Sequence, residues 1–475
     1  MKYEMVIGLE IHAELDTETK IFCSCSTAFG AEENTQTCPI CLAMPGTLPV
    51  LNEKVVEYGV KAGMALNCGI AKYSQLDRKN YFYPDLPKAY QISQFDYPLC
   101  TRGSVEIDVE GNKKSIGIHH IHIEEDAGKL VHDSSEGTLA DYNRGGIPLI
   151  EIVSDPDMRS AEEAKAYAEK IKAILEFTGV SNCKMQEGSL RFDVNLSIRP
   201  QGQEALGTRT EMKNLNSFRS LVRAIEHESQ RQMQALEKGE EIIQETRKWD
   251  DEKGVSYSLR SKEEAQDYRY FPDPDLVPIL LEDSYIERLR EELPELPHSR
   301  KKRYVKELGL PEYDADILTT SRALSDYFEE TLKSYSDAKA VSNWMMGDIL
   351  RLLRAGEIEI EDIPFTSENF AKLLHLIEKK TISGSIGKKV LEEMFKTGKS
   401  PEDIIQEKGL VQINDEKALE DMIRGILQDN PQSVADYKAG KEKAFGFMVG
   451  QTMRISRGKA NPQVVNQVLK RLLEE

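Results

Sequence analysis

Histidine and carboxylate side chains recur at alternate positions in a stretch that has the pattern of a β-strand. Between residues 6 and 15, Glu10, His12 and Glu14 fall on one face and the apolar side chains on the other. Side chains two apart on a strand stand about 6–7 Å from each other, which suits ligands of one or two divalent ions. A solvated sheet face has the same pattern, and this stretch alone favours that simpler interpretation.

A second and a third stretch make a metal site the better interpretation. Residues 118–126 carry three of the chain's eight histidines beside three acidic residues, and solvated faces rarely concentrate histidine in this way. Residues 147–153 place Glu151 between isoleucines in an apolar run. A carboxylate buried in such a position is either paired or bound to a metal.

Two further stretches, residues 190–196 and 208–214, add arginine, lysine and more carboxylates. Together the five stretches predict an antiparallel sheet with a polar face of mixed charge. Carboxylates with one imidazole suit Mg²⁺, and cations opposite them suit phosphate oxygens. This combination indicates phosphoryl transfer from a nucleotide. The chain has no G-x-x-x-x-G-K-[ST] and no G-x-G-x-x-G motif, which excludes a P-loop and a dinucleotide-binding fold.

Four of the seven cysteines fall within nineteen positions, at Cys23, Cys25, Cys38 and Cys41. Two close pairs separated by a polar loop predict a tetrahedral zinc site that orders the loop. Four thiolates leave no open coordination position, so such a zinc ion is structural rather than catalytic. The alternative is four reduced thiols, or a site that has lost its metal.

The composition is that of a globular protein with more than one domain. The chain has 475 residues, a net charge of −19, 40% hydrophobic and 30% charged residues. These values exclude a largely disordered chain, and the length predicts roughly two or three domains. No apolar run approaches the roughly 20 residues of a membrane helix and no signal segment begins the chain, so we expect a cytoplasmic protein. The acidic balance argues against indiscriminate nucleic-acid binding.

Strand and turn signals alternate up to about residue 290, and helical patterns follow. Two prolines within residues 293–297 separate the regions, which predicts an α+β protein with an all-α C-terminal part. The predicted helices span residues 325–332, 338–355, 367–379, 387–396, 416–428 and 461–473. Residues 431–475 carry a charge of +4, which suits an RNA-contacting appendage as well as it suits an ordinary solvated helical pair.

Two other segments are rich in functional side chains. Residues 77–90 interleave aromatics and cations with two prolines, which indicates a rigid loop that lines a pocket or channel, or else a packed surface loop. Residues 259–275 have the character of a phosphate clamp, with Arg260, Lys262 and Arg269 as donors.

These motifs together resemble the B subunits of the glutamyl/aspartyl-tRNA amidotransferases (GatB), over essentially the whole chain. The resemblance rests on residues 8–15, the cysteine pairs with 45–46, and residues 77–88, 122–129, 141–144, 151 and 267–276; residues 430–473 resemble the family's YqeY-like end. It implies a cradle related to glutamine synthetase and guanidino kinases, an antiparallel sheet flanked by helices. The implied domains are a catalytic cradle at 1–293 with a zinc insertion at about 23–41, a helical domain at 294–405 and a tRNA-binding tail at 406–475.

The resemblance also implies a reaction. ATP activates Glu-tRNA(Gln) or Asp-tRNA(Asn) as an acyl phosphate, and ammonia then displaces the phosphate. The chain has no Ser-Ser-Gly-rich amidase signature. A partner should therefore hydrolyse glutamine, which the family assigns to an amidase (glutaminase) chain, its A subunit, joined by a small C subunit in a heterotrimer. The implied cofactors are ATP, Mg²⁺ and structural Zn²⁺.

Candidate roles are carried over residue by residue. His12, Glu125 and Glu151 are the candidate catalytic residues and ligands of one magnesium ion; Glu10, Glu187 and Glu211 are candidates for a second. Glu124 can replace Glu125, since the sequence does not decide which of the two faces inward, and Glu125 can also help to deprotonate incoming ammonium. The candidates for phosphate binding are Arg191, Arg260 and Lys262. An ammonia channel is assigned to Lys79, Tyr81, Lys88 and Asp275, and tRNA contacts to Lys441, Lys443, Arg454, Arg457 and Lys459.

Two rival functions remain at this stage. A free-standing ATP-dependent amide ligase that uses ammonia on a small acid would have no need for a basic helical tail. A non-catalytic RNA-binding scaffold stapled by zinc would leave His12, Glu125 and Glu151 without a role.

Overall fold

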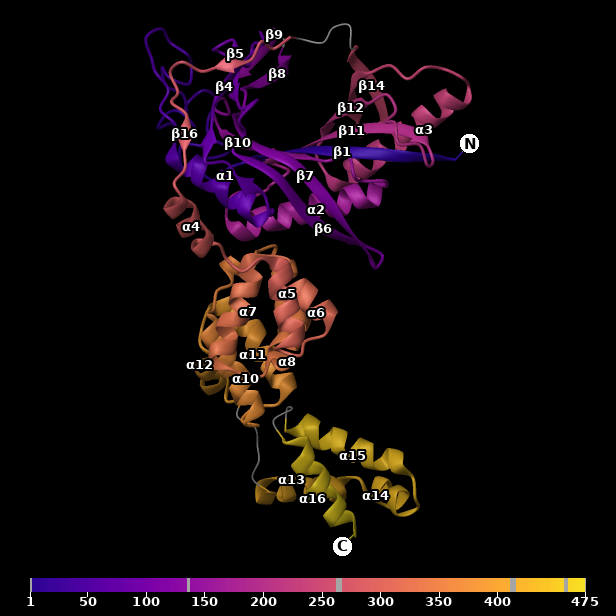
Figure 1. The fold of residues 1–475 in the computed structure, drawn as a ribbon. Coiled ribbons are helices and arrows are strands. Elements are labelled where there is room, and N and C mark those ends of the chain that lie inside the picture. Colours follow the sequence, from indigo (N-terminus) through magenta and orange to yellow (C-terminus); the bar gives the residue numbers. More distant parts are fainter. Residues whose placement is uncertain (1, 135–136, 262–266, 411–415, 457–459, 475) are drawn as a thin grey trace. The chain divides into compact units, whose positions relative to one another are not determined.

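The computed structural model describes residues 2–134, 137–261, 267–410, 416–456 and 460–474. The chain divides into two compact units, Met1–Pro297 and His298–Glu475. The first is built on sheets and the second on helices (Figure 1). The predicted α+β class is therefore confirmed.

The main sheet of the first unit has nine strands. From one edge to the other they are β14 (Val255–Ser261), β13 (Glu245–Asp250), β12 (Thr210–Leu215), β11 (Leu190–Pro200), β1 (Tyr3–Glu14), β10 (Pro148–Ser154), β7 (Asn112–Glu125), β6 (Cys100–Val109) and β2 (Gly69–Ile70). Neighbouring strands are antiparallel except β12 and β13, which are parallel. The prediction of an antiparallel sheet is wrong at this pair. Helix α3 (Phe218–Glu237) leads the chain back to the end of the sheet at which β12 begins, so β13 runs in the same direction as β12.

The central strand β1 shows the predicted alternation of faces. Ile7, Leu9, Ile11 and Ala13 are buried in the core. Their face packs against α2 (Ala161–Thr178) and the neighbouring helices α1 (Glu53–Ala65) and α3, and Figure 1 shows α2 along one side of the sheet. The local sequence patterns indicated only strands and turns in this region; the resemblance implied helices flanking the sheet, without their positions.

A smaller sheet covers part of the opposite, polar face. It consists of β15 (Phe271–Pro272), β4 (Asp77–Asn80) and β5 (Tyr90–Ser93), and β5 contacts β7. Two further pairs complete the unit, β3 (Tyr73–Ser74) with β16 (Ile279–Leu280) and β8 (Lys129–Ser134) with β9 (Gly137–Asp141). The polar face of the main sheet is therefore a walled pocket and not an open surface.

Helix α4 (Asp283–Glu292) is the last helix of the first unit. It ends close to the predicted boundary between the strand-rich and helical regions at residues 293–297. The helices that follow are α5 (Pro297–Lys306), α6 (Glu312–Leu318), α7 (Arg322–Ser334), α8 (Ala338–Trp344), α9 (Leu350–Gly356), α10 (Ser367–Glu378), α11 (Gly384–Thr397), α12 (Pro401–Lys408), α13 (Glu416–Asp429), α14 (Pro431–Lys438), α15 (Glu442–Ile455) and α16 (Pro462–Glu474). All six predicted helices coincide with these, but a π-helical turn (Met345–Ile349) separates α8 from α9.

The helical unit contains two separate apolar clusters. One is formed by residues between 304 and 405, and the other by residues between 419 and 473. Among the described residues, no helix combines the length and the apolar character that crossing a membrane requires.

Two glycines on α1 permit the close approach of this helix to the sheet. A Cβ atom at Gly63 would overlap the sulfur of Cys100 on β6, and one at Gly59 would lie 2.6 Å from Leu99 Cδ2. We expect Gly63→Ala to destabilise the first unit by about 1–3 kcal/mol, although alanine favours helices over glycine by about 1 kcal/mol. Urea unfolding followed by the fluorescence of Trp249, in a Trp344→Phe background, measures this unit alone.

The matched control is Gly425→Ala in α13, where no atom of another described residue lies within 4 Å of an added Cβ. This substitution should stabilise the helices of residues 416–474 slightly, as measured by the loss of helical circular dichroism in urea. If Gly63→Ala stabilised its unit to the same extent, the packing argument would be wrong.

Candidate functional site

Cross-strand neighbours bring two histidines and two glutamates together on the polar face. Strand register places Glu151 on β10 between His12 on β1 and His122 on β7. Glu151 Oε2 lies 3.3 Å from Nε2 of each imidazole. Glu124 completes the group, with carboxylate oxygens 3.6 Å from His12 Nε2 and 3.7 Å from His122 Nε2. Ligand atoms of His12, Glu124 and Glu151 all lie within 4.8 Å of one another, so they could hold one metal ion.

Glu125 does not join this group, contrary to the first expectation. Its carboxylate forms an ion pair with Lys88 and accepts a hydrogen bond of 2.8 Å from the backbone N–H of Ile92. Adjacent residues on a strand face opposite sides, and Glu124 shares the face of His122. The alternative that the sequence left open, Glu124 in place of Glu125, is the arrangement in the structure.

A second carboxylate group lies beside the first. Glu10, Asp193 and Glu211 have ligand atoms within 4.8 Å of one another. Lys213 contacts two of them, at 2.5 Å from Asp193 Oδ2 and 2.8 Å from Glu211 Oε1. Glu187 lies elsewhere, in the turn before β11, where it pairs with Lys184 at 3.3 Å. Asp193 takes the place that was expected for Glu187.

Burial and opposite charge compete in this cluster. Burial alone would lower the pKa of His12 and His122, but Glu151 and Glu124 raise these values to about 9 and about 10. Burial alone would raise the pKa of Glu151, but the two imidazoles hold it well below its usual range. The pKa of Glu10 is raised by burial and by Glu151. The two imidazoles and the carboxylates therefore stabilise one another's charged forms.

Both groups open into one cavity of about 1110 Å³. Lys79 on β4 lines it from the opposite wall, with Tyr268 and Tyr270 beside it. Arg191 does not line this cavity; its guanidinium pairs with Asp126 at 3.0 Å. Arg260 has a described backbone in β14, whereas its side chain and Lys262 lie outside the described residues.

The four expected channel residues do not share one cavity. Lys79 lines the large cavity, and Tyr81 lies next to it with its ring 6.0 Å from Lys79 Nζ. Lys88 and Asp275 line a second cavity of about 240 Å³, which also holds Glu125 and part of the cysteine loop. Glu124 and Glu125 therefore face two different cavities.

Sequence reasoning missed three residues that shape the site. His122 and Asp193 stand at alternate positions of the predicted strands, and this parity was the signal that could have found them. Gln91 on β5 is buried and donates hydrogen bonds to Glu124 Oε2 at 3.2 Å and to the carbonyl of Glu125 at 2.8 Å. No motif marked Gln91, because its role depends on the position of the smaller sheet.

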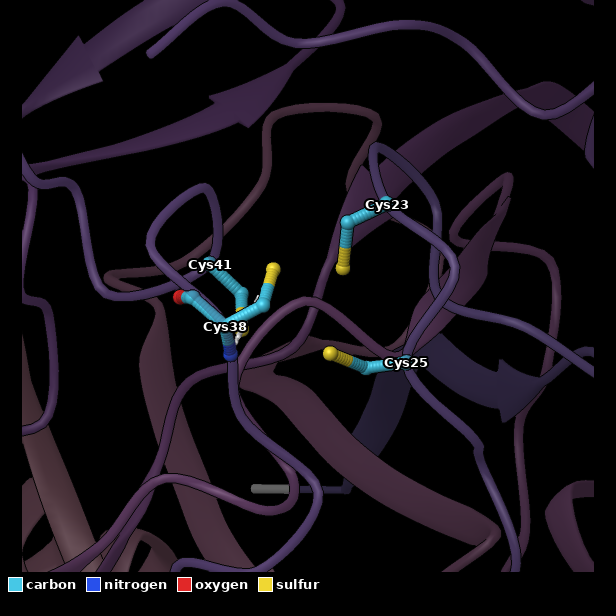
Figure 2. A group of neighbouring side chains, drawn as sticks. All are labelled: Cys23, Cys25, Cys38 and Cys41. Carbon is cyan, nitrogen blue, oxygen red and sulfur yellow. Dashed lines mark hydrogen bonds between the residues drawn. The ribbon is translucent and has the colours of Figure 1, made fainter. Parts of the chain in front are cut away.

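The four close cysteines converge as predicted from their spacing. Figure 2 shows the thiols of Cys23, Cys25, Cys38 and Cys41 pointing toward one another, and their sulfurs lie within 4.8 Å. The Cys38 and Cys41 sulfurs are 3.9 Å apart. A tetrahedral site with Zn–S bonds of about 2.3 Å requires about 3.8 Å between sulfurs, so the donor set fits zinc.

A buried lysine lies against this cluster. Lys20 is 1% exposed, and its ammonium donates to the carbonyl of Tyr142 at 3.1 Å and lies 3.8 Å from Cys41 Sγ. The pKa of Cys41 is lowered to about 4, chiefly by a hydrogen bond from Cys23 and also by the charge of Lys20. This ammonium offsets part of the negative charge that four thiolates would bring.

The tail residues lie on the surface where they are described. Lys443 and Arg454 belong to α15, and Arg454 is exposed. Lys441 is also exposed and pairs with Asp436 at 3.0 Å. Arg457 and Lys459 lie outside the described residues.

Comparison with known proteins identifies the class of the chain. Residues 5–287 match the GatB/GatE catalytic domain, and residues 326–473 match the family described as "GatB domain". The two matched regions are those of a GatB-type subunit, with a catalytic domain followed by a GatB domain. Similar proteins, each named as the B subunit of an aspartyl/glutamyl-tRNA(Asn/Gln) amidotransferase, include that of Caldicellulosiruptor bescii, 61% identical over 100% of both chains. Those of Thermoanaerobacter pseudethanolicus (100% of both chains) and Clostridium botulinum (99% of this chain and 98% of that protein) are 60% and 55% identical.

The chain therefore belongs to the GatB family, the B subunits of the aspartyl/glutamyl-tRNA amidotransferases. It is one subunit of a tRNA-dependent, glutamine-dependent amidotransferase. The resemblance found in the sequence motifs is confirmed.

The cysteine cluster yields a direct test. We expect about one zinc ion per purified chain in the wild type and less than about 0.1 in Cys38→Ser, because one missing thiolate opens the tetrahedral site. Elemental analysis of the protein by mass spectrometry measures both values. Limited proteolysis should also cut residues 23–41 faster in the variant.

Cys68→Ala is the matched control, because Cys68 lies outside the cluster and should retain full zinc content. Zinc-free wild type, or full zinc in Cys38→Ser, would show that the four thiols do not form the site.

Proposed function

We propose that this chain catalyses the ATP-dependent amidation of Glu-tRNA(Gln), Asp-tRNA(Asn) or both, through an acyl phosphate that ammonia attacks. The observation that carries this proposal is the pairing of two carboxylate groups on one face of a single large cavity. A carboxylate on the substrate is a poor acylating agent because oxide is a poor leaving group. Phosphorylation supplies a better leaving group, and the site must then stabilise phosphate charge.

The donor sets fit magnesium. His12, Glu124 and Glu151 offer carboxylate oxygens and one imidazole, and the second group offers three carboxylates. Hard oxygen donors with room for retained water are what Mg²⁺ prefers. Bound magnesium would neutralise phosphate oxygens of ATP. The residues themselves bind and orient: Gln91 holds the Glu124 carboxylate, and Lys213 holds Asp193 and Glu211.

The ammonia in this proposal comes from an amidase partner, with a small third subunit completing the complex. The relatives are named as B subunits, which supports the existence of such partners. We propose that ammonia approaches on the side of the smaller cavity, where the partly buried Lys88 forms an ion pair with the buried Glu125 beside the cysteine loop. Glu125 then accepts a proton from ammonium. One peptide unit separates it from Glu124, which belongs to the first candidate metal group.

The two adjacent glutamates separate metal binding from ammonia handling. In the complex with its partner subunits, Glu124→Gln should weaken binding of Mn²⁺, used as a magnesium probe, and lower tRNA-dependent ATP cleavage at least about 100-fold, because a charged ligand is lost. Glu125→Gln should leave Mn²⁺ binding within about twofold of the wild type, because its carboxylate faces the other cavity. Calorimetry and an ADP-release assay measure the two quantities.

The thermal unfolding of both variants is the control for folding. Loss of Mn²⁺ binding in Glu125→Gln but not in Glu124→Gln would reverse the assignment. An unchanged rate of amidation in Glu124→Gln would overturn the proposed metal site.

The basic residues of α15 are the proposed tRNA contacts of the tail. We expect Lys443→Ala with Arg454→Ala to weaken tRNA binding and to reduce the slope of log affinity against log salt concentration by about 2, since each cation releases about one counterion. Filter binding over a range of KCl concentrations measures the slope.

Lys113→Ala on the exposed end of β7 serves as the control for loss of positive charge. If it changes the salt slope as much as the tail variant, the effect is non-specific and the tail has no special part in tRNA binding.

A further inference from the structure

Lys79 differs from the other lysines near the site in having no carboxylate partner. Lys213 pairs with Asp193 and Glu211, and Lys88 pairs with Glu125. Within the part of the chain that the structure describes, no carboxylate oxygen lies within 4.0 Å of Lys79 Nζ. Its side chain nevertheless lines the same cavity as the two candidate metal groups.

Strand β4 directs Lys79 into this cavity. Arg78, the preceding residue, faces the other side and binds Asp273 with 2.6 Å between Nε and Oδ2. Adjacent strand residues point in opposite directions, so Lys79 faces the polar surface of the main sheet. The acidic groups Glu124 and Glu151 raise the pKa of the Lys79 ammonium against the opposing effect of burial, so it carries its charge at neutral pH.

Aromatic rings hold the ammonium without neutralising it. Lys79 Nζ lies 5.0 Å from the centre of the Tyr268 ring and 6.0 Å from that of Tyr81, within the range of cation–π attraction. Asn80 fixes the Tyr268 segment to β4, because its side-chain amide donates to the carbonyls of Tyr268 and Arg269 at 3.1 and 2.9 Å. The result is a positioned cation whose hydrogen-bond donors remain available.

Lys79 is a positioned cation opposite carboxylates that can hold metal ions. This arrangement suits an anionic group that the ammonium and the metal ions can bind together. We propose that Lys79 binds the phosphoryl group during its transfer from ATP to the aminoacyl carboxylate, and that it does not serve the passage of ammonia. This inference rests on the proposed function. A fixed positive charge attracts anionic phosphate oxygens far more strongly than it attracts a neutral ammonia molecule.

The step is balanced without further reactants. A carboxylate oxygen of the aminoacyl group forms a bond to the γ-phosphorus, and the bond from that phosphorus to the β–γ bridging oxygen breaks, with ADP taking the electron pair. Lys79 keeps its three protons and donates hydrogen bonds to the phosphoryl oxygens. Ammonia then attacks the acyl carbon, and phosphate leaves as hydrogen phosphate with the proton that nitrogen loses.

The first test separates phosphoryl transfer from ammonia supply. The complex with its partner subunits is given MgATP and Glu-tRNA(Gln) without glutamine or ammonium, and ADP release is measured. Lys79→Met should lower this rate at least about 100-fold, as expected for a lost charge-stabilising donor. Lys79→Arg should recover a large part of it, and Lys114→Met, which removes a cation paired with Glu163 outside the cavity, should leave it unchanged.

A binding measurement supports the kinetic one. Calorimetry of inorganic tripolyphosphate with Mg²⁺ on the same complexes should show affinity reduced about tenfold in Lys79→Met, since one charge-assisted contact is lost, and closer to the wild type in Lys79→Arg. A structural role alone would lower the thermal stability of both variants and would not distinguish methionine from arginine in this way.

Two other results would overturn the inference. Normal ADP release in Lys79→Met, with loss only of glutamine-driven product and normal product from added ammonium, would assign Lys79 to ammonia passage and overturn the inference. A wild-type complex that binds the charged tRNA but releases no ADP would overturn the proposed function itself, and this inference with it.

Discussion

Concentrating carboxylates on one face of a buried sheet is the constraint on which the rest of this structure depends. Glu10, Glu124, Glu151, Asp193 and Glu211 lie on neighbouring strands, and like charges so close destabilise one another unless cations share the site. His12 and His122 lie against Glu151, and the ammonium of Lys213 lies against Asp193, so each can contribute positive charge to the cluster. Such a cluster is stable only when its geometry is held from outside, because the charged groups themselves favour separation and hydration.

The outside support comes from the opposite face of the same strands. Ile7, Leu9 and Ile11 alternate with the polar residues of β1 and pack against helices. A shift of one residue in the pairing of β1 would turn every apolar side chain of that strand toward the polar cavity. The apolar core therefore fixes the register, and the register in turn places His12 opposite Glu151. The stability of the unit and the proposed catalysis depend on opposite faces of one sheet.

Structural features that a local sequence pattern determines could be predicted from the sequence. Features that tertiary packing determines could not. Period-two alternation and cysteine spacing predicted the polar faces and the convergence of the four thiols. The same parity places Glu124 with His122 and Glu125 with the buried isoleucines, so the grouping of Glu124 with His12 and Glu151 that the structure shows was available in the sequence. Helix α2 also had a local signal, since Ser160 accepts a hydrogen bond from the N–H of Glu163 as an N-cap. The parallel pair β12–β13 and the role of Gln91 depend on tertiary contacts that no local pattern contains.

Adjacent residues at the end of β7 line two different cavities, and this arrangement gives the proposed reaction its spatial order. Glu124 faces the metal groups and Glu125 faces the cavity of Lys88, so one peptide unit separates them. Gln91 joins both sides, because its amide donates to the Glu124 carboxylate and to the Glu125 carbonyl. Gln91 therefore links the positions of Glu124 and Glu125 through one buried hydrogen-bonded amide. In the proposed reaction, proton removal from ammonium and stabilisation of the acyl phosphate depend on adjacent residues of one strand, which keeps ammonia release close to the acyl group and limits the access of water.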